Sequence, residues 1–91
     1  MKALLRRVEL RFEKISSEEA RAAQYELSLN QAVYRVFIDG VRGTGHIVFD
    51  EEKASLDDLL SRLKPYGVKV VSESRITVDH LVRKSLSYRE E

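Results

Sequence analysis

Residues 32–50, AVYRVFIDGVRGTGHIVFD, determine the fold that the rest of the chain must fit. Apolar and polar side chains alternate on both sides of a central GVRGTG segment, which is typical of two half-buried strands. The three glycines of that segment suit the positive φ angles of a tight turn. The stretch therefore predicts an antiparallel hairpin with strands at 32–40 and 46–50.

A strand and then a helix are predicted before this hairpin. Residues 7–13 alternate strictly, which predicts a half-buried strand. Residues 15–30 have the spacing of an amphipathic helix, and Ser16 with Glu19 fits a capping box at its start.

A helix, a strand and a further helix are predicted after the hairpin. Ser55 and Asp58 fit the start of a helix that ends near Pro65 and Gly67. Residues 68–73 predict a fourth strand. Residues 77–88 predict a third helix, with Thr77 as its N-cap.

The order β-α-β-β-α-β followed by a helix predicts an α+β fold of ferredoxin-like topology, as one domain over residues 1–91. Right-handed crossovers place the first two helices on one face of a four-stranded antiparallel sheet, with the first and third strands central. The alternation then assigns to the helix-covered face Val8, Leu10, Phe12, Tyr34, Val36, Ile38, Ile47, Phe49, Val68 and Val70.

Composition excludes several classes of function. Charged residues make up 34% of the chain, but 16 Lys and Arg nearly balance 15 Asp and Glu, so no bulk attraction to nucleic acid or membrane is expected. The absence of cysteine excludes disulfides and thiolate chemistry. Only Ala3 to Leu5 are apolar in succession near the N-terminus, too few for a signal peptide or a membrane span. We expect a cytoplasmic protein, and the high charge with few amide side chains favours a thermophilic source.

The sheet face opposite the helices is predicted to mix cations with apolar side chains. Four fixed cations would stand there against one carboxylate, Glu9, and Phe37 and His46 would add two flat rings. With the hairpin residue Arg42, the candidate interaction face comprises Arg7, Arg11, Arg35, Phe37, Arg42, His46, Val48, Lys69 and Val71. Two alternatives stay open for this face: binding of RNA or another nucleic acid, and burial under the third helix or a second protein.

Residues 42–49, RGTGHIVF, resemble the third strand of RNA-recognition domains, [K/R]-G-[F/Y]-[G/A]-F-V-x-[F/Y]. The positions that stack on bases in that motif are aromatic, whereas Thr44 and His46 occupy them here. The positions that match are those that any glycine turn and buried strand require. This favours a structural role for the glycines, Ile47 and Phe49.

The first helix carries a second apolar stripe, formed by Ala22, Tyr25 and Leu29, nearly opposite the stripe that faces the core. An uncovered apolar stripe is typical of a contact with another protein, so we predict self-association into a homo-oligomer or binding of a protein partner.

No catalytic or metal-binding constellation is recognisable, and neither an enzymatic activity nor a cofactor is predicted. His46 and His80 are isolated, and the acidic residues 50–52 lack the spacing of a cation site. Ferredoxin-like metal carriers need a cysteine pair after the first strand, where this chain has KISSEE. The leading hypothesis is a non-enzymatic interaction module.

The chain resembles a small domain-of-unknown-function family from hyperthermophilic archaea. The similar stretches are RFEKISSEEA, VYRVFIDG, VFDEEKAS and ITVDHLVRKSL. The resemblance implies an αβ fold and no established activity, and it assigns a role to no individual residue.

Overall fold

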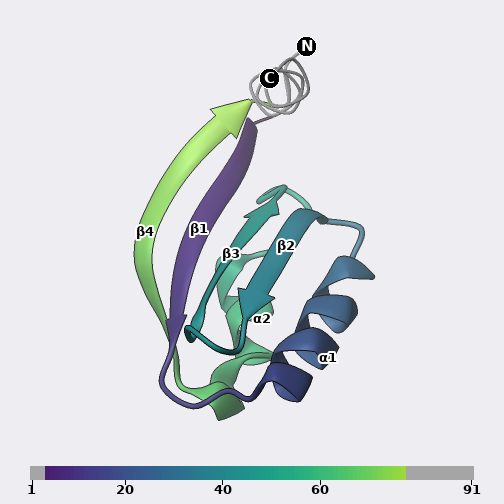
Figure 1. The fold of residues 1–91 in the computed structure, drawn as a ribbon. Helices are drawn as coiled ribbons and strands as arrows, with labels where there is room; N and C mark the ends of the chain where they lie inside the picture. Colours follow the sequence, from purple (N-terminus) through teal and green to yellow (C-terminus); the bar gives the residue numbers. More distant parts are fainter. Residues whose placement is uncertain (1–3, 78–91) are drawn as a thin grey trace, which may run out of the picture.

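The computed structural model describes residues 4–77, which form a sheet with its helices on one face (Figure 1). In chain order the elements are β1 (Leu4–Phe12), α1 (Ser17–Ser28), β2 (Val33–Asp39), β3 (Thr44–Phe49), α2 (Leu56–Ser61), the 3₁₀ helix η1 (Lys64–Tyr66) and β4 (Val68–Thr77). The strands pair antiparallel in the order β2-β3-β1-β4, with β1 and β3 central. The predicted ferredoxin-like α+β fold is confirmed.

Both helices begin at the predicted serine caps. The Ser16 hydroxyl accepts the N–H of Glu19 at 3.1 Å, and the Glu19 carboxylate accepts the N–H of Ser16 at 3.0 Å. Ser55 accepts the N–H of Asp58 at 3.1 Å in the same way. These bonds satisfy backbone donors that a helix start otherwise leaves without partners.

The core lies between the sheet and the two helices. Alternate residues of the central strands meet Ala20, Ala23 and Leu27 of α1 and Leu59 of α2. Its fully buried side chains include Val8, Leu10, Ile47, Phe49, Leu59 and Leu63. Both helices therefore pack on the same face of the sheet, as the right-handed crossovers predict.

The predicted helix-covered face is correct except at Tyr34. The pairing of β2 with β3 shifts register between Val33, which faces Phe49, and Arg35, which faces Val48. Tyr34 is the extra residue of this β-bulge and is 47% exposed, whereas Val33 packs against the core. A one-residue shift exchanges the faces to which side chains point, so the strict alternation assumed for β2 is wrong at its start.

The fourth strand is longer than predicted. β4 continues past Glu73 to Thr77, and its last residues pair with the start of β1, from Leu4 to Arg7. The β1–β4 ribbon consequently rises beyond β2 and β3 (Figure 1). Thr77 is the last residue of β4, and the remainder of the predicted third helix, with His80, lies outside the described residues.

The hairpin turn between β2 and β3 is organised by Asp39. Its carboxylate accepts the N–H groups of Val41 at 2.9 Å and Arg42 at 3.2 Å, and its carbonyl accepts the N–H of Gly43 at 2.9 Å. Of the three glycines in the segment, only Gly43 has a positive φ, at 67°. The predicted turn is confirmed, but a positive φ, expected for all three glycines, is found at Gly43 alone.

Candidate interaction surfaces

The strand register arranges the sheet face away from the helices in rows. Arg7 of β1 and Arg35 of β2 lie on either side of Val48 in β3. In the next row, His46 of β3 lies between Glu9 of β1 and Phe37 of β2. A third row contains Arg11 beside Lys69 of β4. The structure thus brings together most of the predicted interaction face.

Phe37 and His46 form the aromatic centre of this face. Their ring centroids are 6.0 Å apart at an interplanar angle of 36°, and Phe37 remains 49% exposed. Burial, followed by the positive charges of Arg7 and Arg35, lowers the pKa of His46 below 6.5, while Glu9 opposes the shift. His46 is therefore a neutral ring at pH 7, framed by two guanidinium groups.

The excess of positive charge on the sheet face is smaller than the sequence predicted. Glu9 lies 3.4 Å from Arg7, and Glu13 lies 3.3 Å from Lys69. In the turn, Arg42 lies 3.8 Å from Asp39. The count of one carboxylate is therefore wrong, because carboxylates from neighbouring turns and strand ends accompany the cations. These pairs are solvent-exposed, and such pairs contribute only about 0–1 kcal/mol each, so an incoming anion can replace them.

Two apolar members of the predicted face differ in accessibility. Val48 is buried and offers no surface to a ligand, which corrects its place in the predicted site. Leu5, further along the same side of β1, is buried as well. Val71 is 56% exposed at the bulge where β4 shifts register against β1. The accessible part of the face therefore runs over Arg7, Arg11, Arg35, Phe37, His46, Lys69 and Val71.

A second surface is formed by the outer side of α1 and the start of β2. Tyr25 is 67% exposed and Leu29 65%, Ala22 is exposed beside them, and Tyr34 projects from the bulge. We call Tyr25, Leu29 and Tyr34 the α1–β2 patch. The sequence predicted the stripe on α1 but placed Tyr34 in the core, because nothing in the local pattern signals the bulge.

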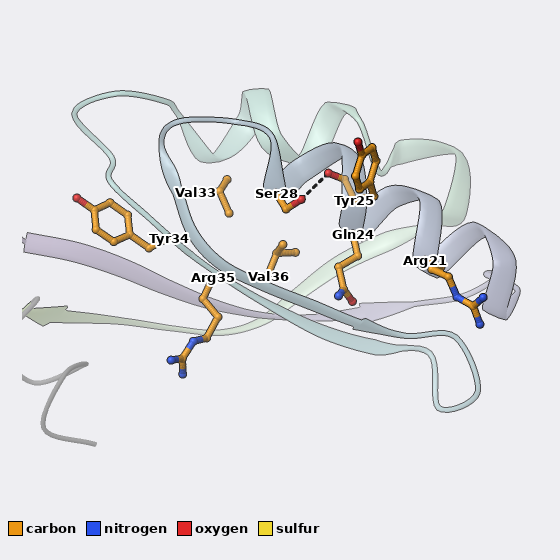
Figure 2. Close-up of a pocket in the computed structure, with 8 residues that line it drawn as sticks. All are labelled: Arg21, Gln24, Tyr25, Ser28, Val33, Tyr34, Arg35 and Val36. Atoms are coloured by element: carbon orange, nitrogen blue, oxygen red, sulfur yellow. Dashed lines mark hydrogen bonds between the residues drawn. The ribbon is translucent and has the colours of Figure 1, made fainter. Parts of the chain in front are cut away.

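An open groove of about 440 Å³ runs between α1 and β2 (Figure 2). Its lining residues are Arg21, Gln24, Tyr25, Ser28, Val33, Tyr34, Arg35 and Val36. Figure 2 shows Gln24 reaching down from α1 to the strand, while Arg35 points away from α1. The groove thus follows the outer edge of β2.

The edge of β2 is only partly closed. Gln24 accepts the N–H of Ile38 at 3.0 Å, so that N–H points away from β3. Backbone groups of an antiparallel strand alternate in direction, and those of Val36 therefore point outward as well. Unpaired outward groups on an edge strand are a template for pairing with another chain.

The acidic residues 50–52 serve the structure of the loop before α2. Asp50 is buried and accepts the N–H of Glu52 at 3.0 Å. Glu51 lies 3.4 Å from Arg6 and 3.3 Å from Arg75. Within residues 4–77, no three metal-ligating side chains gather closely enough to hold an ion.

Replacing His46 by glutamine is expected to reduce the loss of stability between pH 7.5 and pH 5. The pKa of His46 in the folded protein lies below its ordinary value of 6.5. As the pH falls through 6.5, the unfolded chain therefore binds a proton before the folded chain does, and the free energy of unfolding decreases. Urea unfolding of both proteins at the two pH values measures this difference. Equal pH dependence in both proteins would contradict the assigned environment of His46.

Comparison with known proteins supports the fold and identifies the family. The solved structure of oxidized MerP from Ralstonia metallidurans CH34 is similar, with a TM-score of 0.65 and 18% sequence identity over 75% of this chain and 99% of that chain. At this identity the likeness shows the fold alone. No curated protein matches the sequence significantly, and no helix among residues 4–77 is long and apolar enough to cross a membrane. Residues 9–90 match the family described as "Protein of unknown function (DUF3213)", and the chain belongs to this family.

Proposed function

We propose that this chain is a non-enzymatic interaction module that associates with a second copy of itself through the α1–β2 patch. The carrying observation is that Tyr25, Leu29 and Tyr34 are each about half exposed or more, and that Tyr25 and Tyr34 both line the groove between α1 and the outer edge of β2. Grouped exposed apolar side chains are typical of interaction sites, whereas single ones are normal on any surface.

The chemistry of the patch favours association. Leu29, the C-cap of α1, follows Tyr25 by four positions and keeps a helical backbone, so the two side chains are neighbours on the helix surface. Tyrosine supplies a large contact area at little conformational cost, and its hydroxyl tolerates a partly wet interface. A closed dimer uses the same patch on both copies, so one such patch per chain is sufficient.

Light scattering over a range of protein concentration tests the proposal. We expect the mass of a dimer at high concentration, and we expect the double variant Tyr25→Glu, Leu29→Glu to have the mass of a monomer. Val71→Glu is the matched control, because Val71 is also more than half exposed but lies on β4 at the other edge of the described sheet. A monomer at every concentration would remove the proposal.

A second candidate function is binding of single-stranded RNA on the sheet face. The observation that favours it is the ring pair of the exposed Phe37 and the partly buried His46 beside Arg7 and Arg35. Bases stack on flat side chains, and guanidinium groups bind phosphate or stack in turn. The carboxylates of Glu9 and Glu13 limit the net charge of the face, so we expect weak binding that is favoured by low salt.

Neutralising a cation of the sheet face is expected to weaken RNA binding uniformly across sequences. Arg11→Ala and Arg35→Ala should each reduce the slope of log K against log [salt] by about 0.7, the contribution of one contact with a single strand. Fluorescence anisotropy with a labelled oligonucleotide at several salt concentrations measures the slope. Arg62→Ala is the matched control, since Arg62 follows α2 and pairs with Glu26 at 3.1 Å. Absence of binding by the unmodified protein at low salt would exclude this function.

A further inference from the structure

We propose that two copies of the chain pair through the outer edge of β2, antiparallel, with the two-fold axis at Val36. The proposal rests on the self-association proposed above and specifies its geometry. It joins two four-stranded sheets into one continuous sheet of eight strands.

The hydrogen bonding of β2 determines the register. The outward N–H of Ile38 already donates a hydrogen bond to the side-chain oxygen of Gln24, at 3.0 Å. Tyr34 occupies the bulge, where the regular ladder is interrupted. Val36 lies between them with its N–H and C=O directed outward. Val36 is therefore the one residue of β2 that lies in the regular ladder, directs its backbone groups outward and is not bonded to Gln24. Pairing it with Val36 of a second copy forms two reciprocal N–H···O=C bonds.

The same register places complementary side chains across the axis. On the sheet face, Arg35 comes opposite Phe37 of the second copy, in the closer, non-hydrogen-bonded type of pair. A guanidinium over an aromatic face contributes about 0.5–1 kcal/mol at an exposed site. The carboxylate of Asp39 in the second copy lies on the adjacent diagonal, within reach of a long side chain. Each Arg35 therefore lies near an aromatic ring, Phe37, and a carboxylate, Asp39, of the second copy.

The pairing also covers the α1–β2 patch. Since α1 packs over β2 on the helix-covered face, joining the two β2 edges places the two α1 helices on the same face of the joined sheet, one on either side of the axis. Tyr25 and Leu29, which project from the outer side of α1, then lie at the junction between the copies. Burying these exposed side chains supplies the apolar stabilisation that two hydrogen bonds alone would not.

Substituting proline for Val36 in the full chain tests this geometry. Proline removes the outward N–H that the ladder with β3 does not use, and an edge strand tolerates it there. Losing two interchain hydrogen bonds is expected to weaken the dimer about 30-fold. Val36→Thr keeps the N–H and a β-branched side chain, and we expect it to remain a dimer. Sedimentation equilibrium measures both, and circular dichroism checks that each variant is folded.

A second variant keeps the test decisive if the proline disturbs folding. Tyr34→Lys puts a charge on an exposed residue of the same edge, where lysine opposes strand pairing, and it should also yield monomers. Amide hydrogen exchange at Val36 should slow as the concentration of the unmodified protein rises. A dimer that tolerates Tyr34→Lys, with exchange at Val36 independent of concentration, would overturn the strand pairing but leave self-association standing. A strictly monomeric unmodified protein would overturn both.

Discussion

Replacing Phe49 by alanine is expected to lower the free energy of unfolding by about 3–5 kcal/mol, the usual cost of removing a buried aromatic side chain. Phe49 is fully buried at the end of β3, between Arg6 of β1 and Val33 of β2 in the sheet. Its ring belongs to the core that both helices contact. A domain of this size has a total stability of about 5–15 kcal/mol, so the variant should be close to unfolded at 37 °C. Urea unfolding followed by circular dichroism measures the loss.

Phe37→Ala is the matched control for Phe49→Ala. It removes the same side chain from the neighbouring strand, but Phe37 is half exposed on the sheet face, and we expect a loss of about 0.5–1 kcal/mol. Similar losses in the two variants would show that the core does not lie on the helix side of the sheet, which would contradict the assignment of faces.

The fold was predictable because its determinants are local. The serine caps at Ser16 and Ser55 act within one helical turn, and the structure records both. The alternation in β1 and β3 assigned Val8, Ile47 and Phe49 to the core without knowledge of their neighbours. Strand order then followed from the handedness of the crossovers, which is a property of twisted strands and not of this sequence.

The two bulges were not predictable from the sequence, because a bulge is a property of a pair of strands. Tyr34 and Val71 have ordinary strand propensity, and only the pairing with β3 and β1 leaves them as extra residues. The bulge at Tyr34 leaves exposed an aromatic side chain that belongs to the proposed interface.

The composition of the surfaces was predictable in part. Exposure of Ala22, Tyr25 and Leu29 followed from helical periodicity, although their role in association is still a proposal. Glu13, which accompanies Lys69, was left out of the charge count, although the alternation of residues 7–13 places it on the same face as Arg11. Burial of Val48 was one of the alternatives that the sequence left open, because alternation assigns a residue to a face but does not show whether that face is covered there.

Gly40→Ala is expected to lower the free energy of unfolding and also to weaken self-association. Gly40 has room for no side chain: a Cβ atom would lie 2.6 Å from Cα of Ser17 and 2.7 Å from the carbonyl oxygen of Ser16. Both contacts are with backbone at the start of α1, which cannot rotate aside as a side chain could. The helix must therefore move relative to the end of β2, at a cost of about 1–3 kcal/mol.

Moving α1 relative to β2 is expected to weaken the proposed dimer, because both elements contribute side chains to the proposed interface. A loss of 1–3 kcal/mol corresponds to a fall in melting temperature of about 4–20 °C for a domain of this length. Val41→Ala is the control, since Val41 is the next residue in the turn and is 86% exposed, so neither melting temperature nor mass should change. If Gly40→Ala melts at the lower temperature but dimerises as well as the unmodified protein, the position of α1 on β2 does not govern the association. The interface would then have to rely on the β2 edge alone.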